Sequence, residues 1–150
     1  MIQGQIHENF SLCGTLDPVT VVNSEVFTDV IDMRKFHKAL GTLLIGNVAS
    51  ETIVFRAVTC DSAGNNVAAL KTASTLTAHA TNNDNSQILI EVDGADLPGT
   101  TNADRYIKFG VVTGGASGGP MSISVHGIPK HLPATNNDLA SIKEIEIDAD

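Results

Sequence analysis

The chain has 150 residues, a net charge of −8 and a pI near 4.9, with 42% hydrophobic, 4% aromatic and 17% charged residues. This length and hydrophobic content predict one folded domain and exclude a disordered polyampholyte. The acidic charge excludes nucleic acid as the main partner, because neutralising phosphates requires clustered Lys and Arg.

Short segments rich in β-branched residues recur along the chain, separated by turn signals roughly every 8 to 12 residues. Strands are expected over residues 19–22, 25–33, 39–48, 51–60, 72–77, 87–92, 106–112 and 121–126. Residues 33–36 suit a single helical turn, and residues 67–71 suit either a helical turn or a strand. No long amphipathic helix is present. The pattern predicts an all-β fold, an antiparallel β-sandwich that is Ig-like or jelly-roll-like.

The two longest apolar segments follow one another. Residues 39–48 look the most buried of the chain, and residues 51–60 place Ile53, Phe55 and Ala57 on one face. The short link over residues 47–50 predicts that the two segments are neighbouring antiparallel strands.

Both ends of the chain are expected to be extended arms around the sandwich. The domain is expected over residues 19–133, with an N-terminal arm over 1–18 and an acidic C-terminal arm over 134–150. Arms that fold only against a neighbour suit an assembly, although frayed termini give the same pattern. The expected contact residues are apolar: Ile2, Ile6, Phe10, Leu12, Leu139, Ile142, Ile145 and Ile147.

No basic leader segment or long apolar run marks a signal peptide, and no run approaches the about 18 residues that span a membrane. We therefore expect no membrane partner. Cys13 and Cys60 have no CxxC spacing, so two buried thiols are expected rather than a zinc ribbon, with one disulfide as the alternative.

One loop resembles a catalytic motif. Residues 115–120 are similar to the nucleophile loop of chymotrypsin-like serine proteases, and residues 77–79 are similar to their histidine motif. Ala116 replaces the Asp of that family, and His79 and Ser117 are too close in sequence for two barrels. Context marks no orienting carboxylate. A hairpin loop is the expected role, with glycines that permit positive φ, and no catalytic residue is predicted.

Residue patterns for other chemistry are missing. The five histidines form no HExxH or HxH pair, so no metal site is predicted. The Asn/Asp segment 82–85, with Asp93 and Asp96, suits turns better than calcium, because the EF-hand spacing is absent. No phosphate loop or dinucleotide motif occurs, so no cofactor is expected. With no Trp and a single Tyr, Tyr106, a carbohydrate-stacking platform is not favoured.

Five segments in a fixed order carry a resemblance to small tailed-phage and prophage head proteins. The first is a strand that ends in Val-Ile-Asp-Met and a turn (residues 30–36), and the second is an apolar strand (43–46). The third is a strand that leads into an Asp-Ser-x-Gly turn (57–64). An Arg-Tyr-Ile strand (105–109) and an Asn-Asp-Leu-Ala-Ser tail (137–142) complete the order. The resemblance covers residues 26–147, and residues 1–25 and 67–85 match nothing in it.

The resemblance implies a capsid decoration (cement) protein with a mechanical role. It implies a β-sandwich on the outside of the virion, often a homotrimer, that binds the major capsid protein and bridges neighbouring capsomers. The host cytoplasm would hold the protein during assembly. The alternatives are another virion part (a head–tail connector, a tail component or a head-fibre base), a non-catalytic glycan- or receptor-binding module, and an enzyme acting through Ser117 and His79.

Overall fold

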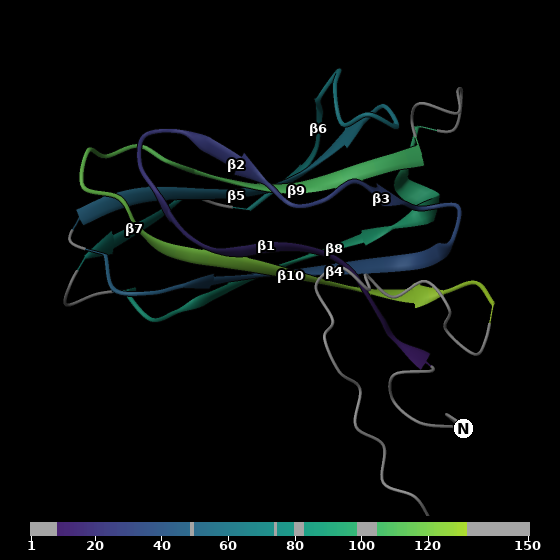
Figure 1. Cartoon of the computed structure of the whole chain (residues 1–150), viewed down its shortest axis with the longest axis horizontal. Helices are drawn as coiled ribbons and strands as arrows, with labels where there is room; N and C mark the ends of the chain where they lie inside the picture. Colours follow the sequence, from purple (N-terminus) through teal and green to yellow (C-terminus); the bar gives the residue numbers. More distant parts are fainter. Residues whose placement is uncertain (1–8, 49, 74, 80–82, 99–104, 132–150) are drawn as a thin grey trace, which may run out of the picture.

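The computed structural model describes residues 9–48, 50–73, 75–79, 83–98 and 105–131. These residues form two antiparallel sheets that pack face to face (Figure 1). The strands are β1 (Ser11–Val21), β2 (Glu25–Phe27), β3 (Ile31–Asp32), β4 (Phe36–Ile45), β5 (Ser50–Cys60), β6 (Ala68–Thr72), β7 (Leu76–His79), β8 (Gln87–Asp93), β9 (Tyr106–Thr113) and β10 (Gly119–Pro129). A single 3-10 turn, η1 (Gly94–Asp96), follows β8.

The strand order identifies the sandwich as a jelly roll. One sheet has the order β1-β10-β4-β8, and the other has β2-β9-β5-β6, with β3 also paired to β9 and β7 also paired to β5. Apart from β2 with β3, and β5 with β6 and β7, which share a sheet, successive strands alternate between the two layers. The two strand orders are those of a jelly roll built of two Greek keys. The predicted all-β sandwich is confirmed, and topology selects the jelly roll over the Ig-like alternative.

Two predicted strands are interrupted. The segment 25–33 forms β2 and β3, both on β9, and between them Thr28 exchanges hydrogen bonds with Phe109. The predicted strand 72–77 spans the break between β6 and β7, both of which pair with β5, and the ambiguous residues 67–71 are mainly strand. The expected turn at 33–36 is closed by the Lys35 N–H, which donates to the Asp32 carbonyl at 3.1 Å.

The prediction that residues 39–48 and 51–60 are neighbouring strands is wrong. β4 lies between β10 and β8, whereas β5 lies in the opposite sheet between β9 and β6. The short link crosses from one layer to the other instead of closing a hairpin. Period-2 alternation determines which side chains face the core. The alternation is the same whether two strands pair in one sheet or lie in opposite sheets, so it does not distinguish the two arrangements.

The core lies between the layers and is aliphatic around two aromatic rings. Phe55 and Phe109 are fully buried, with ring centroids 5.9 Å apart. Leu43 and Ile123 of the other sheet are also buried. The Phe109 ring reaches across the sandwich to the α-carbon of Gly41, a position with no room for a side chain. This is the close approach for which the sequence has glycine in the middle of β4.

The N-terminal boundary of the sandwich differs from the expected one. Residues 11–18, which were expected in the N-terminal arm, form most of β1 and pair with β10. The pattern is irregular there because β1 bulges twice against its partner, so the alternation that marks a strand is lost. No helix of the described part of the chain is long and apolar enough to cross a membrane.

Candidate functional site

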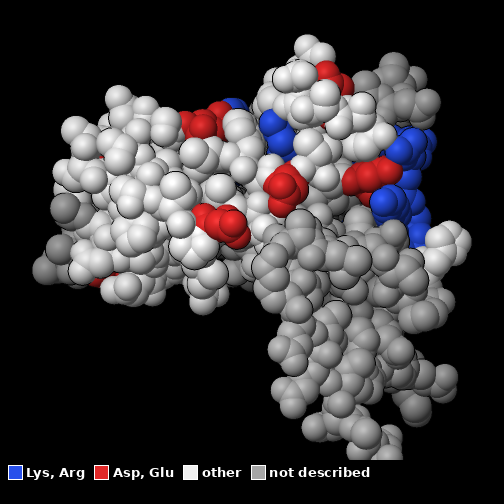
Figure 2. All heavy atoms as spheres, in the orientation of Figure 1, with Lys and Arg blue, Asp and Glu red and all other residues white. Residues whose placement is uncertain are grey.

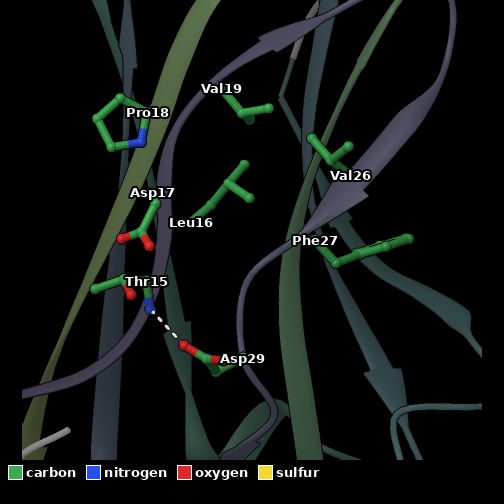
Figure 3. Close-up of a pocket in the computed structure, with 8 residues that line it drawn as sticks. All are labelled: Thr15, Leu16, Asp17, Pro18, Val19, Val26, Phe27 and Asp29. Atoms are coloured by element: carbon green, nitrogen blue, oxygen red, sulfur yellow. Dashed lines mark hydrogen bonds between the residues drawn. The ribbon is translucent and has the colours of Figure 1, made fainter. Parts of the chain in front are cut away.

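A groove runs along the open edge of the sandwich. It has a volume of about 640 Å³ and lies between β1 of one sheet and β2 of the other. Leu16, Val19 and Val26 point toward one another across it, whereas Asp17 and Pro18 point away (Figure 3). The two sheets thus leave an apolar gap at this edge.

The groove is open because β1 cannot continue the sandwich regularly. Leu16 pairs with Ile123 and Val19 pairs with Met121, so β1 carries an extra residue relative to β10 in this interval. Pro18, in this bulge, has no N–H to offer a further strand. Val19 faces the core side, opposite the buried Met121, yet is 39% exposed because no strand covers it.

One end of the groove is closed by a polar contact. The Thr15 N–H donates to Asp29 Oδ2 at 3.2 Å, and the Asp29 N–H donates to the Thr15 carbonyl at 3.2 Å (Figure 3). Asp17 and Asp29, both exposed, make the rim acidic. The groove therefore suits an apolar segment with little negative charge.

The two terminal segments leave the sandwich from one corner. Ser11 at the start of β1 is the register partner of Gly127 near the end of β10 (Figure 1). Phe10 is 39% exposed and Ile128 is 41% exposed at this corner. The structure thus brings together the points from which both expected arms start.

The predicted contact residues divide into two groups. Phe10 directly precedes β1, and Leu12 lies within β1, half-buried and opposite His126, so Leu12 is part of the sheet. The other six lie outside the described residues: Ile2, Ile6, Leu139, Ile142, Ile145 and Ile147.

Charge is unevenly distributed over the surface. Figure 2 shows a half with few charged atoms and an opposite end where Lys and Arg gather. Arg34 and Lys35 lie in the turn before β4, and the Lys130 N–H donates to the Lys35 carbonyl at 2.9 Å, which places three cations at the end where β10 finishes.

The protease-like loop is fastened by a buried glutamate. The N–H groups of Ser117 and Gly118 donate to Glu51 Oε1 at 3.0 and 2.6 Å. Glu51 is 2% exposed, and Oε2 finds no hydrogen-bond partner among the described residues. Gly118 has φ +63°, and a side chain on Gly115 would overlap the Glu51 carboxylate. The loop is therefore built around this carboxylate, which sequence analysis missed.

His79 ends β7, where its backbone lies opposite Ser50. The Ser117 backbone and the His79 backbone therefore both lie close to the first two residues of β5.

Three of the residues considered for calcium, Asn83, Asn85 and Asp93, stabilise turns, and Asn82 lies outside the described residues. Asn83 and Asn85 have φ of 62° and 51°, and Asp93 Oδ1 accepts the Ala95 N–H at 2.9 Å. Within the described ranges, no group of three or more His, Cys, Asp or Glu residues is placed to hold a metal.

The Tyr106 side chain is in contact with Arg34. Arg34 donates to the Tyr106 hydroxyl at 2.6 Å and lies 5.1 Å from the ring centroid, and it also pairs with Asp32 at 2.7 Å. The ring face that a sugar would stack on is therefore covered by a guanidinium on one side.

Replacing Asp32 by Asn should remove a pH-dependent stabilisation. The hydrogen bond from Arg34 holds the Asp32 pKa below its usual value of 3.8. A carboxyl with a lowered folded-state pKa stabilises the protein above its unfolded-state pKa, and this stabilisation disappears as pH falls through the lower folded value. Denaturant unfolding of both proteins should show a gap at pH 6 that closes below pH 3.8. A gap that is constant with pH would contradict this role.

The two cysteines lie in opposite sheets and form no disulfide with each other, and the Cys13 thiol donates to the Val125 carbonyl at 3.4 Å. Cys60 is buried, and burial raises the pKa of its thiol, whereas Cys13 is only half-buried. The expectation of two buried thiols holds for Cys60 and not for Cys13.

Three segments of the phage-protein resemblance meet in one sheet. Asp32 is the register partner of Tyr106, and Tyr106 is the register partner of Cys60. These residues belong to segments 30–36, 105–109 and 57–64, so three motifs far apart in sequence form one end of the β3-β9-β5 layer. Segment 43–46 closes β4, and segment 137–142 lies outside the described residues.

No protein-family model and no curated protein matches the chain. Solved structures resemble it at 10–15% sequence identity. A structure described as "Bacillus endospore appendages form a novel family of disulfide-linked pili" has a TM-score of 0.41, covering 87% of this chain and 99% of that one at 10% identity. Desmodium yellow mottle tymovirus gives 0.42, with 84% and 89% covered at 11% identity. A family 11 carbohydrate-binding module from Clostridium thermocellum gives 0.35, with 85% and 92% covered at 15% identity. These values assign the chain to none of the three families.

Proposed function

We propose that this chain is a structural virion protein, a decoration protein that binds the outside of a tailed-phage head and bridges neighbouring capsomers. The observation that carries the proposal is the corner where Ser11 pairs with Gly127, because both terminal segments start there beside exposed Phe10 and Ile128. A sandwich whose two terminal segments start side by side, each with apolar residues, can engage two neighbours at once.

The order of the phage-like segments and the jelly-roll fold support this role. Jelly rolls include viral capsid domains, although lectins and cupins share the fold, so topology alone assigns no function. The described surface offers an apolar edge and a charged end.

Burial of the arms supplies the binding energy in this proposal. Ten residues laid on a neighbour cover several hundred Å², worth several kcal/mol at about 25 cal/mol per Å² of apolar area before ordering costs. Repetition over a capsid multiplies this gain. The net charge of −8 keeps the protein from binding the packaged DNA.

Co-sedimentation with heads that lack the protein tests the function. We expect a homotrimer by light scattering that pellets with the major capsid protein in a constant ratio. Deleting residues 136–150 should weaken head binding at least about tenfold, the equivalent of about 1.4 kcal/mol. A full-length monomer that stays in the supernatant would contradict the proposal, and a ring of six or twelve would favour a connector.

A matched pair of variants separates apolar from charged contacts in the C-terminal segment. The first replaces Ile142, Ile145 and Ile147 by Ser and keeps every charge. The second replaces Glu144 and Glu146 by Gln and keeps every isoleucine. Burial predicts that only the first variant loses head binding.

A further inference from the structure

We infer that the groove between β1 and β2 receives residues 1–8 of a second copy, so that copies of this chain assemble by exchanging N-terminal segments. This rests on the proposed function and deepens it, because it names the contact that would hold a homo-oligomer together. The groove's lining, its charge and its position relative to Ser11 all favour this occupant.

The chemistry of the groove selects the N-terminal segment over the C-terminal one. Leu16, Val19 and Val26 line it, and Asp17 and Asp29 stand at its rim. Residues 132–150 carry five acidic residues and one lysine, so the rim repels them. Residues 1–8 carry a single acid, Glu8, at the end nearest their own sandwich.

The sequence of residues 1–8 has the period of a strand. Ile2, Gly4 and Ile6 alternate with Gln3, Gln5 and His7, so an extended backbone places both isoleucines on one side. In an extended strand, the four-residue step from Ile2 to Ile6 spans about 13 Å. The bulge and Pro18 limit the main-chain hydrogen bonds that β1 can offer, so the apolar side chains of the segment carry the contact with the groove.

The geometry favours a segment from another copy, because a fold-back of the same chain cannot bring Ile6 to Leu16 and would have to pass the Thr15–Asp29 contact. Ile6 precedes Ser11 by five residues, and Leu16 follows Ser11 by five residues. If the chain folded back beside its own β1, no residue would remain for the turn, so Ile6 could not reach Leu16. The Thr15–Asp29 hydrogen bonds also close the edge between Ser11 and the groove. A second copy can approach from the open end.

Such an exchange is a head-to-tail contact, in which the donor surface and the acceptor groove differ. Contacts of this kind form a closed ring when the rotation between copies closes. In a ring of three, each groove would bind the N-terminal segment of a neighbouring copy, and no groove or segment would be left over. Pro18 and the bulge in β1 prevent an ordinary strand from pairing with this edge, so only a segment that also fills the apolar groove can bind there.

Disulfide trapping between differently tagged copies tests the inference without any phage head. All copies carry Cys13→Ser, and Cys60 stays because it is buried. One tagged copy carries Ile6→Cys and the other carries Val19→Cys, and the two are co-expressed and oxidised. We expect a disulfide-linked pair of unlike copies on a non-reducing gel. The matched control is Thr20→Cys, because Thr20 pairs with Pro120 on the outer face, away from the groove.

Light scattering of the chain lacking residues 1–8 provides the second measurement. The inference expects a monomer of unchanged fold by circular dichroism. It is overturned if the shortened chain keeps the oligomeric mass, if Thr20→Cys cross-links as well as Val19→Cys, or if a single copy carrying both cysteines closes an internal disulfide. Head binding is measured separately, so a decoration protein that assembles in another way would still pellet with heads.

Discussion

Replacing Phe109 by Ala should lower the free energy of unfolding by about 3–5 kcal/mol, a large share of the stability of a domain this size. The Phe109 side chain is fully buried, packs against Phe55 and covers Gly41 of the opposite sheet. Its removal leaves a cavity at a point where the two layers approach closely. Urea unfolding followed by circular dichroism measures the change.

A double-mutant cycle with Gly41 identifies the cause. Gly41→Ala alone places a methyl group against the Phe109 ring and should cost about 1–3 kcal/mol through overpacking. In the Phe109→Ala background the same methyl group enters the cavity. The double variant should therefore be more stable than the sum of the single changes predicts. Additive effects would show that the two positions do not share this space.

Local alternation predicted the strands where one face is buried. Residues 51–60 and 87–92 became β5 and β8 nearly as expected, and Ile53, Phe55, Ile90 and Val92 face the core. Alternation does not encode which strands pair, because pairing in a jelly roll joins residues far apart in sequence. β1 and β10, at opposite ends of the chain, are partners for this reason.

The bulged part of β1 does not have the sequence pattern of a strand. Asp17 and Pro18, which were expected in the N-terminal arm, both lie inside β1. Proline is tolerated there because β1 is an edge strand and its outer side needs no ladder hydrogen bonds. The same bulge opens the groove, so the feature that hid the strand also produced the candidate site.

The sequence predicted two arms, but it did not predict that both start at the same corner of the sandwich. Ile2, Ile6 and the C-terminal isoleucines are predicted contact residues because they are apolar and lie outside the sandwich. They are outside the described residues, so their contacts stay a prediction. The pairing of Ser11 with Gly127 required the sheet. Glu51 was missed because a single glutamate at the start of a strand is a common surface pattern, and only the Gly-rich loop folding over it makes it buried.

Replacing Glu51 by Ala should destabilise the protein by about 2–4 kcal/mol. The change removes the acceptor of two backbone N–H groups, and each buried donor left without a partner costs about 1–3 kcal/mol. Glu51→Gln keeps one oxygen acceptor and should cost less. Hydrogen exchange at the amides of Ser117 and Gly118 should accelerate in the order wild type, Gln, Ala, while exchange in the core of β5 changes little.

The competing expectation for Glu51 is stabilisation, because a buried carboxylate with an unpartnered oxygen carries a desolvation cost. The geometry decides against it. The Gly118 N–H is buried and loses its acceptor once the carboxylate is gone, so the loop must open to water. Glu91→Ala is the matched control, since that exposed glutamate pairs with Lys38 at the surface, where such pairs contribute little. A Glu51→Ala variant as stable as the control, with unchanged exchange at residues 117 and 118, would show that the loop holds its shape without the carboxylate.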